Sequence, residues 1–112
     1  MKSYSDFFSL LSDETRLRCL VLLSTEPELC VCDLCQTLDC IQPKVSRHLS
    51  LLRNSHLVTD ERRGQWVYYQ LNKDLEIPFK TLLHEIITNL QKAEPFASDR
   101  KKLKTVLKSR CC

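Results

Sequence analysis

Residues 30–52, CVCDLCQTLDCIQPKVSRHLSLL, predict two short helices joined by a tight turn. The first helix starts at Cys30-Val31-Cys32-Asp33 and carries Leu34 and Leu38 on its inward face. Pro43 fits the first turn of the second helix, because the N–H that proline lacks has no partner there. The apolar side chains of this second helix recur at helical spacing, at Val45, Leu49 and Leu52. The short linker between the two helices predicts a helix-turn-helix unit.

Two β-rich segments follow this unit, at Leu57–Glu61 and Gln65–Leu71, on either side of Arg62-Arg63-Gly64. The second segment is rich in aromatic and β-branched residues, which favours a strand. A hairpin with a basic tip directly after a helix-turn-helix is the winged-helix arrangement. We therefore expect a mainly α fold with a small β-hairpin wing, with Trp66 and Tyr68 in the core rather than stacked on bases.

Further helices are predicted on both sides of this centre. Phe7, Phe8, Leu10 and Leu11 suggest a first helix, and Ser12-Asp13-Glu14 is typical of the start of a second, which should stop near Glu26-Pro27. After Pro78 comes a long apolar stripe that a domain of this size cannot easily cover alone, so we expect it to form a dimer interface. The stripe consists of Phe79, Leu82, Leu83, Ile86, Ile87 and Leu90.

The last segment is expected to be a basic helical extension. Ser98-Asp99 could cap a short helix that turns Leu103, Val106 and Leu107 inward and several lysines outward. We accordingly divide the chain into a winged-helix domain with its dimerisation helix, residues 1–92, and a C-terminal extension, residues 93–112.

Composition and charge narrow the class of protein. The 112 residues, 43% of them apolar and 28% charged, correspond to a single folded domain. Net charge rises along the chain, because the basic side chains cluster after residue 43, which permits a DNA-facing patch. No apolar run is long enough for a membrane span, and residues 1–6 do not look like a signal peptide, so we expect a cytoplasmic protein. In a reducing compartment, seven cysteines favour metal binding or thiol chemistry over a disulfide scaffold.

Four segments, in order and at matching spacing, resemble the ArsR/SmtB family of winged-helix repressors. They are residues 11–17 (LSDETRL), 28–35 (ELCVCDLC), 42–49 (QPKVSRHL) and 66–69 (WVYY). The resemblance covers about residues 4–92. It implies a homodimer that binds operator DNA and leaves it when a metal or metalloid binds. Ile41 departs from the pattern, which usually has Ser there as a helix cap.

In such proteins the second helix of the turn motif lies in the major groove, and the wing contacts phosphate or the minor groove. A two-fold dimer would read an imperfect palindrome of double-stranded operator DNA. The side chains expected to contact DNA are Gln42, Lys44, Ser46, Arg47 and His48 on the second helix, and Arg62, Arg63 and Gln65 on the wing.

Cys30, Cys32 and Cys35 are the predicted ligand set. Cys32 and Cys35 share a helical face, and Cys30 can join them if it is the N-cap residue, with Asp33 as the acid of a capping box. A helix N-terminus also favours the thiolate. Three soft thiolates without a fourth protein ligand suit As(III) or Sb(III), which accept three-coordination, rather than tetrahedral zinc. No organic cofactor is expected.

Other interpretations of these cysteines remain open. By spacing alone, Cys-x-Cys-x2-Cys fits a metal site and a thiol switch equally well, so a redox- or persulfide-responsive repressor is an alternative. A thiol oxidoreductase or arsenate reductase is disfavoured, because the chain has a single glycine and no phosphate-cradling context. A zinc site on the dimer helix would have only His84 and Glu85, and His84 is expected at the surface.

The remaining cysteines are expected to have other roles. Cys19 lies among apolar residues and is expected in the core, and core packing is also favoured for Cys40, with a role as fourth ligand as the alternative. The pair Cys111-Cys112 lies beyond the family match, and the sequence does not decide whether it binds a metalloid.

Overall fold

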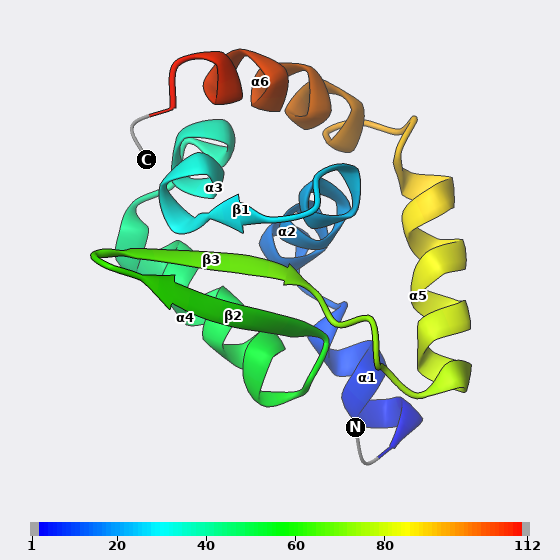
Figure 1. The fold of residues 1–112 in the computed structure, drawn as a ribbon. Helices are drawn as coiled ribbons and strands as arrows, with labels where there is room; N and C mark the ends of the chain where they lie inside the picture. Colours follow the sequence, from blue (N-terminus) through cyan, green and yellow to red (C-terminus); the bar gives the residue numbers. More distant parts are fainter. Residues whose placement is uncertain (1–2, 111–112) are drawn as a thin grey trace.

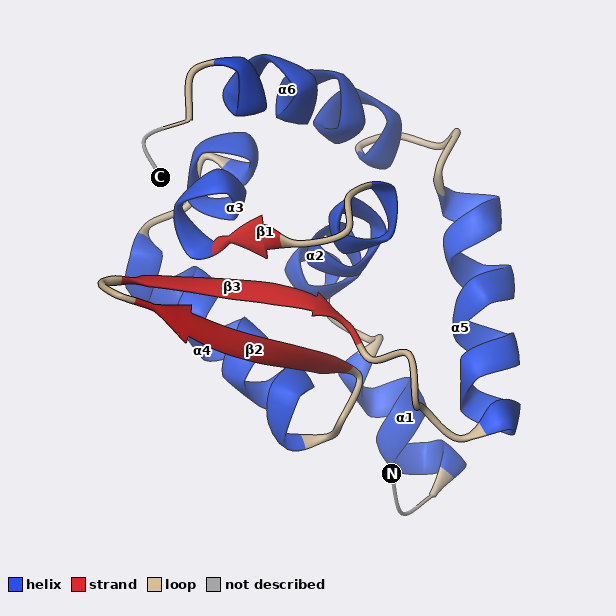
Figure 2. Ribbon diagram, in the orientation of Figure 1, coloured by secondary structure: helices blue, strands red, loops and turns tan. Residues whose placement is uncertain are grey.

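The computed structural model describes residues 3–110 and has six helices and a three-stranded antiparallel sheet (Figures 1 and 2). In chain order the elements are α1 (Tyr4–Leu10), α2 (Glu14–Thr25), β1 (Leu29–Cys30), α3 (Val31–Leu38), α4 (Gln42–Asn54), β2 (Val58–Arg63), β3 (Trp66–Leu71), α5 (Ile77–Leu90) and α6 (Phe96–Lys108). Over this range, none of the helices combines the length and the apolar character that crossing a bilayer requires.

The predicted helix-turn-helix is present as α3 and α4. Asp39 adopts a left-handed conformation with φ of 53°, which ends α3 and turns the chain towards α4. Pro43 lies in the first turn of α4, as expected. Val45, Leu49 and Leu52 are fully buried, so the apolar face of α4 packs into the core and its other face is left for contacts outside the domain.

The hairpin forms with Arg63 opposite Trp66, so Gly64 and Gln65 make a two-residue turn. Gly64 has φ of +64°, which a glycine adopts without strain. The two arginines therefore lie in β2 rather than at the tip. Trp66 and Tyr68, which were expected in the core, are only half-buried, and the buried residue of β3 is Tyr69.

A third strand, β1, was not predicted from the sequence. Its two residues pair with β3, Leu29 opposite Tyr69 and Cys30 opposite Tyr68. The strand is too short to show an alternating pattern of its own. As a result, the sheet order is β1-β3-β2, and the thiol-bearing segment forms the edge of the wing's own sheet.

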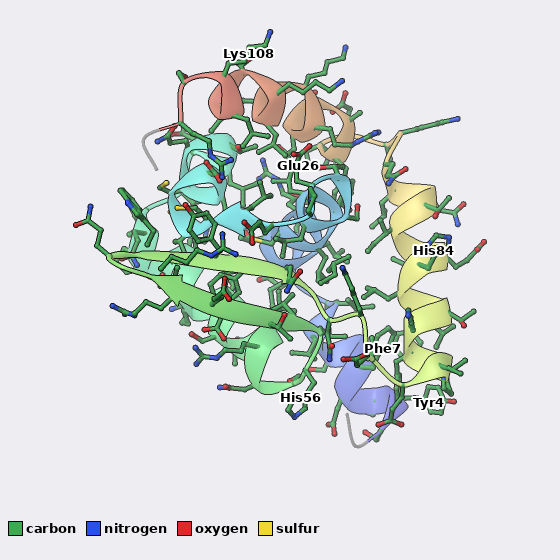
Figure 3. All side chains as sticks on the ribbon, viewed as in Figure 1. Tyr4, Phe7, Glu26, His56, His84 and Lys108 are labelled. Carbon is green, nitrogen blue, oxygen red and sulfur yellow. The ribbon has the colours of Figure 1, made fainter. Side chains whose placement is uncertain are left out.

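The core is built around α2, whose residues 19–23 are all buried. Asp13 caps α2 by accepting a hydrogen bond from the Arg16 N–H, and the helix ends at Thr25, as the sequence predicted. Tyr4 and Phe7 of α1 lie beside the start of α5 (Figure 3), and their rings are 5.0 and 5.2 Å from the Phe79 ring.

The C-terminal helix is longer and more firmly attached than predicted. It begins at Phe96, so Ser98 and Asp99 lie inside α6 and are not its caps. In Figure 1 it crosses above α2 and α3, and both contacts are extensive. Asp99 is buried and accepts two hydrogen bonds of 2.8 Å from Arg18 of α2. Residues 96–108 therefore pack onto the winged-helix core.

Candidate functional site

The thiols of Cys30 and Cys32 form a close pair at the N-terminus of α3. Their Sγ atoms are 2.8 Å apart. Cys30 is the N-cap residue, and its Sγ accepts a hydrogen bond from the Cys32 N–H at 3.4 Å. The Asp33 carboxylate in turn accepts the Cys30 N–H at 2.9 Å, so the predicted capping box is confirmed.

Asp33 connects this capping box to the end of the chain. Its side chain is 1% exposed, and Oδ2 also accepts a hydrogen bond from Arg110 Nη2 at 2.7 Å. Within residues 3–110 its other oxygen, Oδ1, has no hydrogen-bond partner. Burying a carboxylate is costly unless it is paired, so the ion pair with Arg110 stabilises the start of α3 from a position 77 residues away.

Cys35 follows one turn later and is half-buried. Burial raises the pKa of its thiol, and the neighbouring Cys40 and Cys30 add to the shift, because each thiolate disfavours another nearby. Among the described residues, no three His, Cys, Asp or Glu side chains are already placed to hold one metal ion. The structure therefore assembles two of the three predicted sulfur ligands and places the third close by.

A cavity of about 320 Å³ lies beside these sulfurs. Three parts of the fold bound this cavity: the start of α3, the first residue of α4, and the hairpin turn with the start of β3. The lining residues are Cys30, Val31, Cys32, Cys35, Gln36, Gln42, Gln65, Trp66 and Val67. A ligand at the thiols would therefore lie next to both elements predicted to contact DNA.

Four of the five DNA-contact candidates on α4 have side chains that reach solvent. Gln42, Lys44 and Arg47 are exposed, and Ser46 is partly so. Gln42 donates a hydrogen bond of 2.7 Å to the Ser46 hydroxyl, which holds both side chains at the start of the helix. Each of these four side chains can therefore contact another molecule without displacing core residues.

The prediction that His48 faces outward is wrong. Its side chain is buried, with Nδ1 3.2 Å from Arg16 Nη1 and Nε2 3.9 Å from an Asp13 oxygen. Because an arginine can only donate, Nδ1 is the acceptor, so the ring is neutral with its proton on Nε2, towards Asp13. Burial lowers the pKa of His48, although Asp13 opposes this shift. His48 thus fixes α4 against the start of α2 and does not face a partner.

The wing arginines differ from each other. Arg62 is exposed, whereas Arg63 donates two hydrogen bonds to Glu28 and one to Glu61, and its guanidinium lies 4.6 Å from the centre of the Tyr68 ring. Glu28, followed by Glu61, raises the pKa of Arg63 above its usual range. Arg63 is thus held in ion pairs at the protein surface, where its side chain is 48% exposed, and Arg62 and the turn residue Gln65 are exposed beside it.

The predicted interface helix buries only half of its stripe. Phe79, Leu83 and Ile87 pack into the domain's own core, whereas Leu82, Ile86 and Leu90 stay half-buried. His84, labelled in Figure 3, is exposed on α5, as expected. The apolar surface of α5 that is left for contact with a second chain is therefore narrower than predicted.

The other cysteines are placed as the sequence suggested, where they are described. Cys19 is fully buried, and burial raises the pKa of its thiol to about 12. Cys40 is partly buried against the core and lies 3.4 Å from the Leu38 carbonyl oxygen. Cys111 and Cys112 lie outside the described residues.

Several of these site features have no local sequence signal. Arg110 and Glu28 find their partners across 77 and 35 residues, so no short motif marks them. The exposed Gln36 looks like any polar position on a helix surface. The burial of His48 had one available clue, because it precedes the core residue Leu49 and so lies at the edge of the buried face.

Comparison with known proteins agrees with this arrangement. Residues 13–60 match the model of the family described as "Bacterial regulatory protein, arsR family". An "Arsenical resistance operon repressor" of Escherichia coli (strain K12) is 58% identical over 65 residues, which are 58% of this chain and 56% of that protein. A Staphylococcus aureus protein of the same name is 39% identical over 89 residues, which cover 80% and 78% of the two chains.

A solved structure shows the same architecture. Reduced HlyU from Vibrio cholerae N16961 superposes with a TM-score of 0.66 at 27% identity, over 81% of this chain and 87% of that one. The fold and these matches define a winged-helix protein of a family of transcriptional regulators, which are not enzymes. The chain belongs to the arsR family of bacterial regulatory proteins. It spans little more than half the length of the Escherichia coli relative.

Proposed function

We propose that this protein is a transcriptional repressor that binds operator DNA as a homodimer and releases it when As(III) or Sb(III) binds Cys30, Cys32 and Cys35. The observation that carries the proposal is the close Cys30–Cys32 thiol pair in a cavity shared with α4 and the wing turn. The names of the two arsenical resistance relatives support the same ligand class.

DNA binding uses the exposed side chains of α4 and the wing. Gln42 can pair with adenine, Lys44 and Arg47 with guanine or phosphate, and Ser46 with either base or phosphate. Arg62 and Gln65 contact the backbone or the minor groove beside them. His48 leaves the predicted contact set, because its side chain is buried, whereas Arg63 stays in the set, because its side chain is 48% exposed and its ion pairs lie at the surface. Double-stranded DNA as the partner also implies that the protein acts in the cytoplasm.

The dimer is expected to form along α5, through Leu82, Ile86 and Leu90. Two-fold symmetry would place the two α4 helices in major grooves about 34–36 Å apart, and the operator would be an imperfect palindrome.

Ligand binding acts on the start of α3. Arsenite, as As(OH)3, reacts with three thiols to form three As–S bonds, and its hydroxides leave as three waters that carry the thiol protons. Cys30 and Cys32 are already paired, so Cys35 must approach them, which distorts the first turn of α3. Because α3 packs against α4, the conformation that binds arsenite and the conformation that binds DNA exclude each other in this region. A coupling of ~1–3 kcal/mol is the usual size for such linked sites.

A gel shift with the DNA upstream of the protein's own gene tests the proposal. Arsenite should release the DNA under reducing conditions, and zinc should not. Cys32→Ser and Cys35→Ser should keep DNA binding but lose release by arsenite, whereas the control Cys40→Ser should behave like the natural protein. Normal release from the Cys32 and Cys35 variants would contradict the ligand assignment.

A second candidate is a thiol redox switch of the same fold. The 2.8 Å separation of the Cys30 and Cys32 sulfurs favours it, because an oxidant could remove two electrons and two protons from this pair to form a disulfide. Release by a mild oxidant, with no response to arsenite in the presence of a reductant, would select this function over metalloid sensing.

A further inference from the structure

Another cavity lies where the end of α5 meets α6, and it shares no lining residue with the cavity beside the thiols. Its volume is about 360 Å³. Four of its lining side chains carry a positive charge, and among the described residues no Asp or Glu lines it. A cavity of this composition favours an anionic ligand. The lining residues are Gln91, Lys92, Ala97, Arg100, Lys101 and Lys104.

Arg100 connects the two helices at this cavity. Its Nη1 donates a hydrogen bond of 3.2 Å to the carbonyl oxygen of Gln91, the residue that ends α5. Its Nε is buried and has no hydrogen-bond partner within residues 3–110. A buried donor without a partner costs free energy, so a small rotation of the guanidinium towards a bound oxyanion would be favourable. The planar fork of arginine N–H groups also matches the oxygens of a phosphate.

The positive side chains of the cavity repel one another. Arg100 and Lys104 lie four residues apart on α6, and Lys101 and Lys104 three, and like charges at these spacings destabilise a helix. Glu94 offsets only part of this repulsion, because it already accepts the Ser98 N–H at 3.1 Å. The hydrogen bonds from Ser98 and then the charge of Lys101 lower the pKa of the Glu94 carboxyl. A bound anion would remove the repulsion that Glu94 leaves.

The position of the cavity distinguishes between sources of this anion. In Figure 1 the connection between α5 and α6 lies at the upper right, and the turn between β2 and β3 lies at the left, on the opposite side of the molecule. DNA in contact with α4 and the wing would therefore lie away from the cavity. This position favours a small soluble ligand over the phosphates of the DNA backbone.

We propose that the cavity between α5 and α6 binds the phosphate group of a small soluble molecule, held by Arg100 and the three lysines that line it. A phosphomonoester carries nearly two negative charges at neutral pH and three strong acceptor oxygens, which a cluster of cations can match. Because the ligand would contact residues from both helices, it would hold α6 against the end of α5. The site uses none of the thiols, so this inference does not depend on the proposed response to arsenite.

Inorganic phosphate is the probe, titrated into the full chain at constant ionic strength maintained with chloride. The line width and shift of its ³¹P NMR signal give the Kd. The double variant Lys101→Gln/Lys104→Gln removes two charges from the lining of the cavity. Its matched control is Lys102→Gln/Lys108→Gln, which removes two exposed charges of the same helix that do not line the cavity. Both variants lower the net charge equally.

The variant in the lining should raise the Kd for phosphate by more than about tenfold, and the control variant by less than about threefold, because salt screens charges outside the site. Phosphate at ten times its Kd should raise the Tm of the natural protein by roughly 5 °C. In chloride alone, the variant in the lining should be at least as stable as the natural protein, since it removes like-charge repulsion. This measurement also shows that the variant is folded.

Three results would contradict the inference. One is a natural protein that leaves the ³¹P signal of phosphate unchanged. Another is an equal loss of affinity in the two double variants, which would show a general attraction to a basic helix. The third is a variant in the lining that binds phosphate normally but loses affinity for DNA in the gel shift, which would assign these cations to the DNA backbone.

Discussion

Asp99→Ala tests whether α6 is an integral part of the domain. The carboxylate is only 6% exposed and accepts two hydrogen bonds of 2.8 Å from Arg18, whose side chain is 23% exposed. Hydrogen bonds to charged groups contribute roughly 1.5–3 kcal/mol each, but the truncated site leaves Arg18 in reach of water, which reduces the loss. We expect the free energy of unfolding to fall by about 2 kcal/mol.

Urea unfolding at one fixed protein concentration, followed by circular dichroism, measures this loss. For a domain of about 100 residues the same loss corresponds to a Tm lower by roughly 8 °C. Asp74→Ala is the matched control, because Asp74 is exposed, and its removal should cost less than about 0.5 kcal/mol.

A double-mutant cycle with Arg18→Ala isolates the pair itself. If the two substitutions share one interaction, their combined effect should fall short of the sum of the single effects by at least about 1 kcal/mol. A coupling energy near zero, or an Asp99→Ala variant as stable as the control, would show that α6 is a separable extension.

Three further substitutions or treatments have defined outcomes. Because burial lowers the pKa of His48, the unfolded chain binds its proton at a higher pH than the folded one, so stability should fall as pH drops from about 7 to about 5.5. His48→Gln should lose this part of the pH dependence of the free energy of unfolding, measured with urea. An unchanged pH dependence would assign the effect to other titratable groups. Ile86→Lys should convert the expected dimer into a monomer in sedimentation equilibrium, and a persistent dimer would place the interface elsewhere. Cys19, with a pKa of about 12, should resist iodoacetamide in the native protein at about pH 8 while Cys32 reacts, as peptide mass mapping would show; equal labelling would contradict its burial.

The sequence was most informative where structure depends on neighbours in the chain. The caps at Asp13 and Cys30, the proline in the first turn of α4 and its buried apolar face all follow from residues within one or two turns of each other. The short turn at Gly64 is local in the same way. These features were enough to predict the winged helix and to place the thiols at a helix N-terminus.

Features that depend on distant residues were out of reach. The periodicity of α4 predicts which side of the helix is buried, but it does not show that α2 closes over His48 through Arg16. Likewise, the sequence predicted a basic helical extension at the end of the chain, but it did not show that Arg110 contacts a carboxylate at the start of α3. Such pairs form only after the chain has folded, so they leave no periodic pattern in the sequence.

In the proposed function, the position of Cys30 connects a bound ligand to both parts of the predicted DNA-binding surface. As the N-cap of α3 it determines the first turn of the helix that packs against α4, and as the last residue of β1 it pairs with Tyr68 of the wing. Two residues earlier, Glu28 holds Arg63 of β2 by a bidentate ion pair. A ligand that moves the Cys30 sulfur therefore acts on α4 and on the wing through direct neighbours. Coupling over such short contacts requires no relay through the core, so core substitutions that leave the fold intact should change stability more than they change the response to arsenite.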